Sequence, residues 1–405
     1  MKKYDLAVIG GCSAGLAAAI NAKRIDPSLN VAVVEKLPRT GKKLLATGNG
    51  KCNITNLYAL DHGYVNKGFT SFAMSVYNPQ KIIEFFASMG LFTYADSCGR
   101  VYPESNMAAS VVDALRFELE RLGINVICDM SVTDIRKSGG GFIVNGDIFC
   151  KKLVLAAGGK SSAPQGSDGS GFELAKKLGH TVTETVPALV PLNSKPEITK
   201  PLKGMRARNV TLTLKGEKIL AGTQGEILFT EYGLSGIAAM ELAAPAQKYI
   251  NSVKRNPFTS IDFLPDMAYD ELVVYLKNLN KIKGFCKIEN LLTGILPKTV
   301  GIAICKACNL YNAEKSISEL SDKDLRRIAE KIKNFSLEIT GTRGFLNAQV
   351  TSGGIKTDEI NEKTMESKIC KNLYLAGEII DVDGGCGGFN LQWAWASGML
   401  AGELK

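Results

Sequence analysis

A glycine-rich segment near the N-terminus has the composition of a loop that binds a dinucleotide. It occupies residues 10–15, between an apolar run at 4–9 that predicts a buried strand and an alanine-rich run at 16–20 that predicts a helix. Such a loop turns tightly and presents the N–H groups and positive dipole end of the helix to a pyrophosphate. The candidate cofactor contacts in it are Gly10, Gly11, Ser13, Ala14 and Gly15.

One position of this loop departs from the usual glycine pattern. Cys12 stands at the second glycine site, where the backbone comes nearest the phosphates. Because cysteine is small, the loop can accommodate it with a slight shift. We interpret Cys12 as a packing residue rather than a redox-active thiol.

A carboxylate follows the second predicted strand, at 31–35. This residue, Glu35, comes 20 positions after Gly15. A carboxylate at the end of this strand can accept hydrogen bonds from a ribose diol, and it would repel a 2′-phosphate. Glu35 and the adjacent Lys36 are therefore candidate contacts, and the two strands with their intervening helix form a βαβ unit.

The loop that follows Glu35 is dense in glycines, amides and lysines. It covers residues 41–56 and shows no apolar periodicity. Long loops of this composition are usually functional, and glycines let the backbone approach a ligand closely. The alternative is a surface loop with solvated lysines. The candidate contacts are Lys42, Thr47, Gly48, Asn49, Gly50, Lys51, Cys52 and Asn53.

A second glycine loop lies near the C-terminus, after a short apolar run at 373–376. The loop at 384–388 leads into a predicted helix at 389–400. An acidic residue after the strand can bond ribityl hydroxyls, and the helix N-terminus would stabilise negative charge on a reduced flavin ring. Because a nicotinamide dinucleotide does not need this element, it favours FAD. The candidate contacts are Gly377, Glu378, Asp381, Gly387, Gly388, Phe389, Asn390 and Leu391.

Further candidate contacts lie between residues 125 and 159. Residues 125–150 predict a β-meander, and 153–157 predict a separate buried strand that ends at two glycines. The candidates there are Val132, Ala156, Ala157, Gly158 and Gly159.

Three residues are candidates for the chemical step. Arg100 could hold a carboxylate or polarise a carbonyl, and Tyr102 could donate a proton to an enolate. A structural salt bridge and a packed aromatic ring are the alternatives for these two. Cys52 could tune or protonate the cofactor ring, or could simply pack as a small residue.

The sequence offers little for imidazole or metal chemistry. Its only histidines are His62 and His180, and His180 follows Gly179, which favours a role in ending a helix. The pair Cys305 and Cys308 lies in an apolar helical run without a second pair or a nearby histidine. We therefore expect no metal site.

Composition and charge exclude several classes of protein. The chain has 405 residues, 45% hydrophobic and 22% charged, as in ordinary globular proteins, and its net charge of +9 is scattered. We expect no nucleic-acid partner, no membrane segment, and a cytoplasmic location with reduced cysteines. The residues near the C-terminus have glycine-rich and apolar runs like those of the first 160 residues, and unlike the middle of the chain. We therefore expect a discontinuous Rossmann-like domain at 1–187 and 345–405, interrupted by a β-rich segment at 188–265 and a helical segment at 266–344.

Several blocks together resemble the BaiN-type family of NAD(P)/FAD-dependent oxidoreductases, also called aminoacetone-oxidase-like flavoproteins. The resemblance runs along nearly the whole chain, with departures at Cys12, Ala157 and Cys386. The blocks that carry it are residues 41–56, 99–105, 155–161, 166–171, 225–230, 350–354, 364–368 and the C-terminal glycine loop.

The resemblance implies an α/β fold in which a two-part Rossmann domain binds FAD non-covalently and carries an inserted β-barrel and a helical segment. It also implies hydride transfer at flavin N5, which is the cofactor's own chemistry. The first hypothesis is reduction of an α,β-unsaturated carbonyl in a 3-oxo steroid-like substrate, with NAD(P)H as a transient donor. The alternatives are an oxidase of a small amine that releases peroxide, and a non-catalytic flavoprotein that senses or passes electrons. The oligomeric state stays open.

Overall fold

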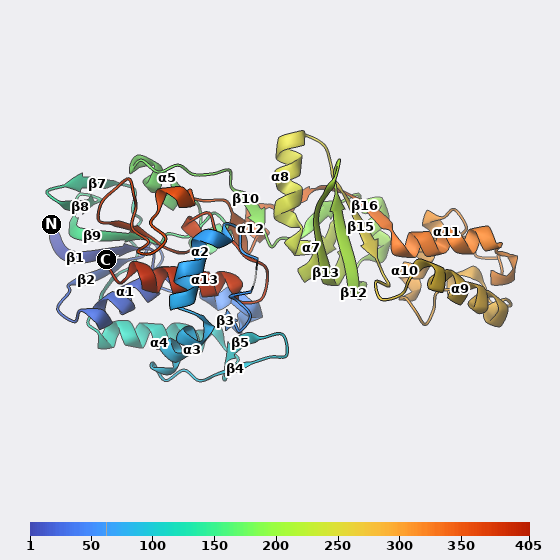
Figure 1. The fold of residues 1–405 in the computed structure, drawn as a ribbon, viewed down its shortest axis with the longest axis horizontal. Coiled ribbons are helices and arrows are strands. Elements are labelled where there is room, and N and C mark those ends of the chain that lie inside the picture. Colours follow the sequence, from blue (N-terminus) through green and yellow to red (C-terminus); the bar gives the residue numbers. More distant parts are fainter. Residues whose placement is uncertain (62) are drawn as a thin grey trace. The chain divides into compact units, whose positions relative to one another are not determined.

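The computed structural model describes residues 1–61 and 63–405 (Figure 1). The chain divides into two compact units, the first formed by Met1–Val186 with Ala348–Lys405 and the second by Pro187–Asn347. The first unit is therefore built from both ends of the chain. His62, one of the two histidines considered above, lies outside the described residues.

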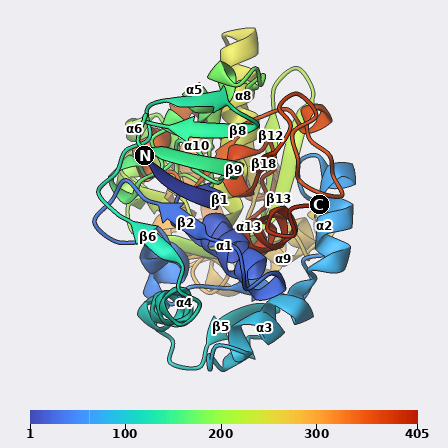
Figure 2. The same ribbon diagram turned by 90° about the vertical axis from the view of Figure 1, so that its left-hand side faces the viewer.

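A seven-stranded sheet forms the centre of the first unit (Figure 2). Its order is β6-β2-β1-β9-β8-β7, and β18 also pairs with β9. The strands β6, β2, β1, β9 and β18 run parallel, and the apolar residues of β1 and β2 are buried, as the sequence predicts. The bounds are β1 Lys2–Ile9, β2 Val31–Val34, β6 Asn125–Ile127, β7 Ile135–Ser138, β8 Gly141–Val144, β9 Ile148–Leu155 and β18 Leu373–Leu375.

Two strands differ from the sequence-based expectation. Residues 148–155 form one strand rather than two, because the first half of β9 pairs antiparallel with β8 while its second half pairs parallel with β18. The lysines at 151 and 152 in its centre hid this continuity in the sequence. Likewise β6, expected within the meander, pairs parallel with β2. Both errors arise because pairing partners are chosen by tertiary contacts.

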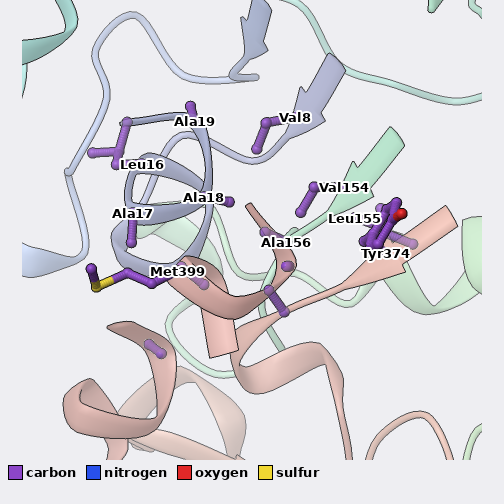
Figure 3. Packing of buried hydrophobic residues seen from close by; sticks show 14 of the residues in the cluster. Val8, Leu16, Ala17, Ala18, Ala19, Val154, Leu155, Ala156, Tyr374 and Met399 are labelled. Carbon is purple, nitrogen blue, oxygen red and sulfur yellow. The ribbon is translucent and has the colours of Figure 1, made fainter. Parts of the chain in front are cut away.

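Two helices from opposite ends of the chain pack against each other beside β1 and β9. They are α1 (Ser13–Ile25) and α13 (Phe389–Ala401), and both are buried along most of their length. Figure 3 shows Leu16, Ala17, Ala18 and Ala19 of α1 and Met399 of α13 among the buried hydrophobic residues. A Cβ on Gly398 would lie 2.3 Å from the carbonyl oxygen of Ala14, and one on Gly402 would lie 2.4 Å from that of Ala18. Backbone therefore contacts backbone at these two glycines, which fixes the C-terminal helix on the N-terminal one.

The remaining helices of the first unit follow the predicted apolar spacing. In α4 the buried Val111, Val112, Leu115 and Leu119 share one face, and the chain leaves the helix through Gly123 at a φ of +64°. A separate three-stranded sheet has the order β3-β5-β4, which the sequence analysis did not anticipate. The bounds are α2 Lys67–Val76, α3 Pro79–Ala87, α4 Ala108–Arg121, α5 Ser170–Lys177, β3 Thr55–Asn56, β4 Thr93–Ala95 and β5 Arg100–Pro103, with the short strands β10 Val186–Ala188 and β17 Val350–Ser352.

The second unit contains a closed antiparallel barrel of order β11-β14-β13-β12-β15-β16. Closure comes from β16 pairing with both β15 and β11, so no edge of the barrel stays open. The predicted fold class, a Rossmann-like domain with an inserted barrel, is thereby confirmed. The bounds are β11 Leu192–Ser194, β12 Arg206–Lys215, β13 Ile219–Thr230, β14 Gly233–Ser235, β15 Phe258–Asp262 and β16 Phe335–Thr342.

The segment of chain that connects barrel strands β15 and β16 contains a group of helices. The residues of β16 fall in the range expected to be helical, yet they close the barrel. The last helix of this segment begins after Ser321, whose side chain caps the backbone of Asp324 while Asp324 caps Ser321 in return. The helices of this unit are α6 Pro196–Thr199, α7 Ile237–Glu241, α8 Ala243–Val253, α9 Tyr269–Lys283, α10 Lys298–Ala307, α11 Asp322–Lys333 and α12 Gly344–Asn347.

His180 joins the end of α5 to the segment that precedes β18. Its main-chain N–H closes the helix by donating to Ala175, after Gly179 at a φ of +96°. Its ring is buried, with Nδ1 2.9 Å from Oε2 of Glu359 and Nε2 2.9 Å from Oγ of Ser367. The ring therefore has a partner at both nitrogens and links two distant parts of the first unit.

We expect the contact between His180 and Glu359 to stabilise the fold in a pH-dependent way. Burial pushes the pKa of Glu359 up, but hydrogen bonds from Thr181 and His180 outweigh it and hold this pKa below its usual value. Because the folded-state pKa is depressed, the stabilisation is present above the unfolded-state pKa and is lost as the pH falls through the folded-state value. Glu359→Gln should lower the free energy of unfolding at neutral pH by about 1.5–3 kcal/mol.

Urea unfolding at neutral and acidic pH measures this effect. The difference between Glu359→Gln and the parent protein should shrink as the pH falls below the ordinary glutamate value of 4.5. Glu362→Gln, at an exposed glutamate of the same segment, is the control and should unfold like the parent. An unchanged urea midpoint for Glu359→Gln at neutral pH contradicts the prediction.

Candidate functional site

The first glycine loop has the close backbone contacts of a dinucleotide site. Gly10 has a φ of +106°, and a Cβ there would lie 2.4 Å from the carbonyl oxygen of Ala156. A Cβ on Gly15 would lie 1.9 Å from the carbonyl oxygen of Gly10. At the start of α1, Cys12 makes no side-chain capping bond and the first turn has no acidic residue. The loop and helix N-terminus therefore fit an anionic group such as a pyrophosphate.

Cys12 and Cys52 are neutral thiols in this region. Burial raises the pKa of Cys12, and it raises the pKa of Cys52 to about 12. The side chain of Cys52 is fully buried, and its backbone lies in the left-handed region at a φ of +58°. A thiol this far from ionisation does not act as a nucleophile at neutral pH, so both cysteines fill space beside the loop.

Glu35 ties the end of β2 to the glycine loop. Its Oε2 accepts a hydrogen bond of 2.8 Å from the N–H of Gly11, and its Oε1 accepts one of 2.9 Å from the N–H of Leu37. Each carboxylate oxygen keeps a second lone pair, which fits a ribose diol. The neighbouring Lys36 forms an ion pair with Asp168 at 2.8 Å. Burial pushes the pKa of Asp168 up, but hydrogen bonds from Lys36 and Ser170 lower it to about 2.

The loop at 41–56 contains a short 3₁₀ helix, Leu44–Gly50, whose end turns through left-handed conformations. Gly48, Asn49 and Gly50 have φ values of +56°, +54° and +84°. The candidates Lys42, Asn49, Gly50 and Lys51 are exposed, and Thr47, Gly48 and Asn53 are half-buried. Val132 is half-buried in the loop between β6 and β7.

Glu378 is the point where four separate blocks of the sequence meet. Its Oε2 lies 2.8 Å from Nζ of Lys43, and its Oε1 accepts a 2.8 Å hydrogen bond from the N–H of Thr351. The hydroxyl of Thr351 in turn accepts hydrogen bonds from the N–H groups of Lys160 and Ser161. We name the four residues Lys43, Gly159, Thr351 and Glu378 the Glu378 cluster.

Glycine is required at one position of this cluster. A Cβ on Gly159 would lie 2.4 Å from Oγ1 of Thr351 and 2.7 Å from Oε1 of Glu378. Just before Glu378, a Cβ on Gly377 would lie 2.8 Å from Cβ of Ala14. The candidate residues 14, 159, 377 and 378, far apart in the sequence, are thus brought together.

The amide side chains of Asn390 and Asn56 both hold the second glycine loop, and Nδ2 of Asn56 donates to the carbonyl oxygen of Gly387 at 2.9 Å. Oδ1 of Asn390 accepts from the N–H of Gly384 at 2.9 Å, and its Nδ2 donates to the carbonyl oxygen of Gly384 at 2.8 Å. Gly388 has a φ of +99°, and a Cβ there would lie 2.5 Å from the carbonyl oxygen of Thr55. Gly388, the residue before α13, has no side chain with which to cap that helix. The candidates Phe389 and Leu391 lie in the first turn of that helix. The candidate Asp381 lies before the loop, and its Oδ2 accepts a hydrogen bond from the hydroxyl of Thr183.

Arg100 and Tyr102 lie on β5 beside both glycine-rich loops. The Cβ position of Gly387 is 3.7 Å from Cδ of Arg100, and that of Gly48 is 3.5 Å from Cε1 of Tyr102. Nε of Arg100 donates to Oδ2 of Asp96 at 2.8 Å, which fixes the guanidinium. The structure therefore gathers the two catalytic candidates at the loops expected to hold the flavin.

Some residues of the site were missed by the sequence analysis. Lys43, and not the exposed Lys42, is the lysine whose ammonium pairs with Glu378. Thr351 and Asp96 act through hydrogen bonds to other site residues. Only the resemblance of residues 350–354 to the family pointed toward Thr351, since neither spacing nor periodicity singles out any of the three.

Among residues 1–61 and 63–405, no group of three or more His, Cys, Asp or Glu side chains is arranged to hold a metal ion. Cys305 and Cys308 are buried in α10 and at its end, and burial raises the pKa of Cys305 to about 12. Within the same described residues, no helix is both long enough and apolar enough to span a bilayer.

The fold and site define a Rossmann-fold nucleotide-binding protein whose site is shared by the two ends of the chain. The model of the HI0933-like protein Rossmann domain matches residues 4–404. The chain therefore belongs to the HI0933-like family, as the sequence resemblance indicated, and it is an oxidoreductase.

Relatives agree with this assignment, and a solved structure shares the fold. The chain is 38% identical to the 3-dehydro-bile acid delta(4,6)-reductase of Clostridium scindens over 98% of both proteins. It is 28% identical to the ribosomal RNA dihydrouridine synthase of Escherichia coli, over 98% of this chain and 96% of that one. The 3-ketosteroid delta1-dehydrogenase of Sterolibacterium denitrificans shares the fold, with a TM-score of 0.50 and 13% identity. The match covers 100% of this chain and 99% of that one.

The tight contact at Gly159 yields a specific prediction. Gly159→Ala should displace Glu378 or Thr351 and lower the free energy of unfolding by about 1–3 kcal/mol, because the added methyl group overpacks the site. The purified variant should also lose the visible absorbance of oxidised flavin relative to its protein absorbance.

Gly68→Ala is the matched control. Gly68 lies in α2, and an added Cβ there meets nothing within 4 Å. This variant should keep its absorbance and unfold at an equal or higher urea concentration, since alanine favours a helix. Equal flavin content in the Gly159→Ala variant and the parent contradicts the prediction.

Proposed function

We propose that the protein is an FAD-dependent reductase of a carbon–carbon double bond conjugated to a carbonyl, in a small cyclic substrate of the 3-oxo steroid type. The observation that carries the proposal is the placement of Arg100 and Tyr102 beside Gly48 and Gly387 of the two glycine-rich loops. The name of the relative in Clostridium scindens, which covers 98% of both chains, supports this substrate class.

The residues of the first unit fit FAD. The uncapped N-terminus of α1 suits the pyrophosphate, and Glu35 suits the ribose diol. Glu378 suits a ribityl hydroxyl, and the positive dipole end of α13 suits negative charge at the ring. When bound, FAD supplies a two-electron carrier that accepts and donates hydride at N5. We infer NAD(P)H as the transient donor, and a cytoplasmic setting, in which cysteines stay reduced.

Arg100 would bind and polarise the substrate carbonyl. Its guanidinium is held by Asp96, so that the N–H groups facing the substrate are fixed before the substrate arrives. Burial opposes the positive charge of Arg100, yet the hydrogen bond to Asp96 raises its pKa. A fixed, permanently charged donor stabilises negative charge that develops on the carbonyl oxygen as the double bond accepts hydride.

Tyr102 would supply the proton that completes the reduction. Burial raises the pKa of its hydroxyl, and this effect outweighs the lowering of the pKa by the nearby charge of Arg100. The hydroxyl is therefore protonated at neutral pH and can donate to the carbon next to the carbonyl. Arg100 would favour this step because it stabilises the tyrosinate that results.

A second candidate substrate is a uracil ring in RNA. Uracil also contains a double bond conjugated to a carbonyl, and the Escherichia coli relative bears the name of a ribosomal RNA dihydrouridine synthase. The charge of this chain is uneven: residues 187–347 contain 23 Lys or Arg and 16 Asp or Glu, which accounts for +7 of the total +9. Such a basic unit suits a polyanion. The higher identity to the bile-acid reductase favours the small cyclic ketone.

Anaerobic spectroscopy distinguishes these functions. The purified protein should be yellow, and NADH or NADPH should bleach its flavin absorbance. A cyclic 4-en-3-one should then restore the absorbance faster than O₂ does, with formation of the saturated ketone. Bleaching by neither nucleotide contradicts the donor assignment.

The same experiment reports on the alternatives. Faster reoxidation by a uridine-containing RNA, with formation of dihydrouridine, would favour the RNA substrate. Bleaching by an amine such as aminoacetone, with peroxide release in air, would favour the oxidase. Tight FAD without turnover in any arm would favour a non-catalytic electron carrier.

The role of Tyr102 can be tested separately from flavin reduction. Tyr102→Phe should lower kcat for enone reduction by about 10²–10⁴-fold, the usual contribution of a positioned acid, and should leave the rate of flavin reduction by NAD(P)H unchanged. Tyr94→Phe is the matched control, because its hydroxyl donates to Asn106 and its ring lies 5.9 Å from that of Tyr102. Equal kcat losses for the two variants contradict the assignment.

A further inference from the structure

We propose that Lys43 is the cation of the cofactor site: held by Glu378, its ammonium binds an anionic oxygen of the FAD pyrophosphate. The inference deepens the proposed function and rests on FAD as the cofactor. It assigns a phosphate-binding role to a residue that neither loop spacing nor glycine pattern points to.

The position of Lys43 supports this role. Its Nζ lies 2.8 Å from Oε2 of Glu378, and the two side chains are only 17% and 21% exposed. The backbone just before it lies against the first glycine loop, since the N–H of Gly41 donates to the carbonyl oxygen of Gly11 at 2.8 Å. Lys43 is therefore close to both the N-terminus of α1 and Glu378, which are the two places expected to bind the pyrophosphate and the ribityl chain.

The charge balance of the site calls for a cation at this place. The carboxylates of Glu35 and Glu378 both lie in the site, and a pyrophosphate would add further negative charge. Lys36 is paired with Asp168, whereas the side chains of Lys42 and Lys51 are exposed. Lys43 is half-buried within the same loop, and so it is placed to offset the repulsion between Glu378 and the phosphates.

The hydrogen-bonding capacity of Lys43 leaves room for a ligand. An ammonium group has three N–H donors, and the contact with Glu378 uses one of them. The second carboxylate oxygen of Glu378 is engaged by Thr351, which fixes the carboxylate and with it the ammonium. A donor fixed in this way binds a phosphate oxygen with little loss of side-chain entropy.

Flavin titrations of the apoprotein test the proposal. Lys43→Met should weaken FAD binding by about 10- to 100-fold, as expected for a lost charge-assisted hydrogen bond. Riboflavin, which has the same ring and ribityl chain but no phosphate, should bind Lys43→Met and the parent protein equally. Lys43→Arg should recover most of the FAD affinity because it keeps the charge. Lys81→Met, which breaks the exposed ion pair with Glu84 at 2.9 Å, is the control and should bind FAD like the parent.

A double variant separates phosphate binding from simple pairing with Glu378. If Lys43 served only to neutralise Glu378, then Lys43→Met combined with Glu378→Gln would bind FAD as well as Glu378→Gln alone. We expect instead that the Lys43→Met change weakens FAD binding in both backgrounds. Recovery in the double variant, or equal losses for FAD and riboflavin, would overturn the proposal. Failure of the parent protein to bind FAD would instead overturn the proposed function on which it rests.

Discussion

The carboxylate of Glu378 is the contact on which the geometry of the site depends. It joins Lys43, Thr351 and the backbone at Gly159, which come from regions of the chain more than a hundred residues apart. Half-buried carboxylates are costly unless their oxygens are paired, and here each oxygen has a partner. The cluster therefore holds the glycine-rich segments in one fixed arrangement, and a methyl group at Gly159 is enough to disturb it.

The same arrangement requires that the two ends of the chain fold together. Helices α1 and α13 contact each other through backbone at Gly398 and Gly402, and the strands β1 and β18 both pair with β9. Neither end can complete the sheet or the site alone. This is why residues 187–347 can be inserted between Val186 and Ala348 without interrupting the nucleotide-binding unit.

The thiols and the imidazole of the first unit have structural roles. The thiols of Cys12 and Cys52 are kept neutral by burial, and His180 is engaged at both ring nitrogens in a structural link. Beside the two loops lie a guanidinium fixed by Asp96 and a protonated phenol. These groups suit a reaction in which a carbonyl gains negative charge and then takes up a proton.

The sequence by itself determined the fold class and, through the resemblance of several blocks, the family. Local signals were enough to predict the glycine-rich loops, because a glycine loop between a strand and a helix, and an acid at the end of the next strand, are short-range patterns. The tertiary structure alone decided that 148–155 is one strand, that β16 closes the barrel, and that Lys43 rather than Lys42 pairs with Glu378. Adjacent lysines are equivalent as sequence, but only one of them faces a carboxylate that arrives from 335 residues away, and such long-range pairings leave no periodic trace in the chain.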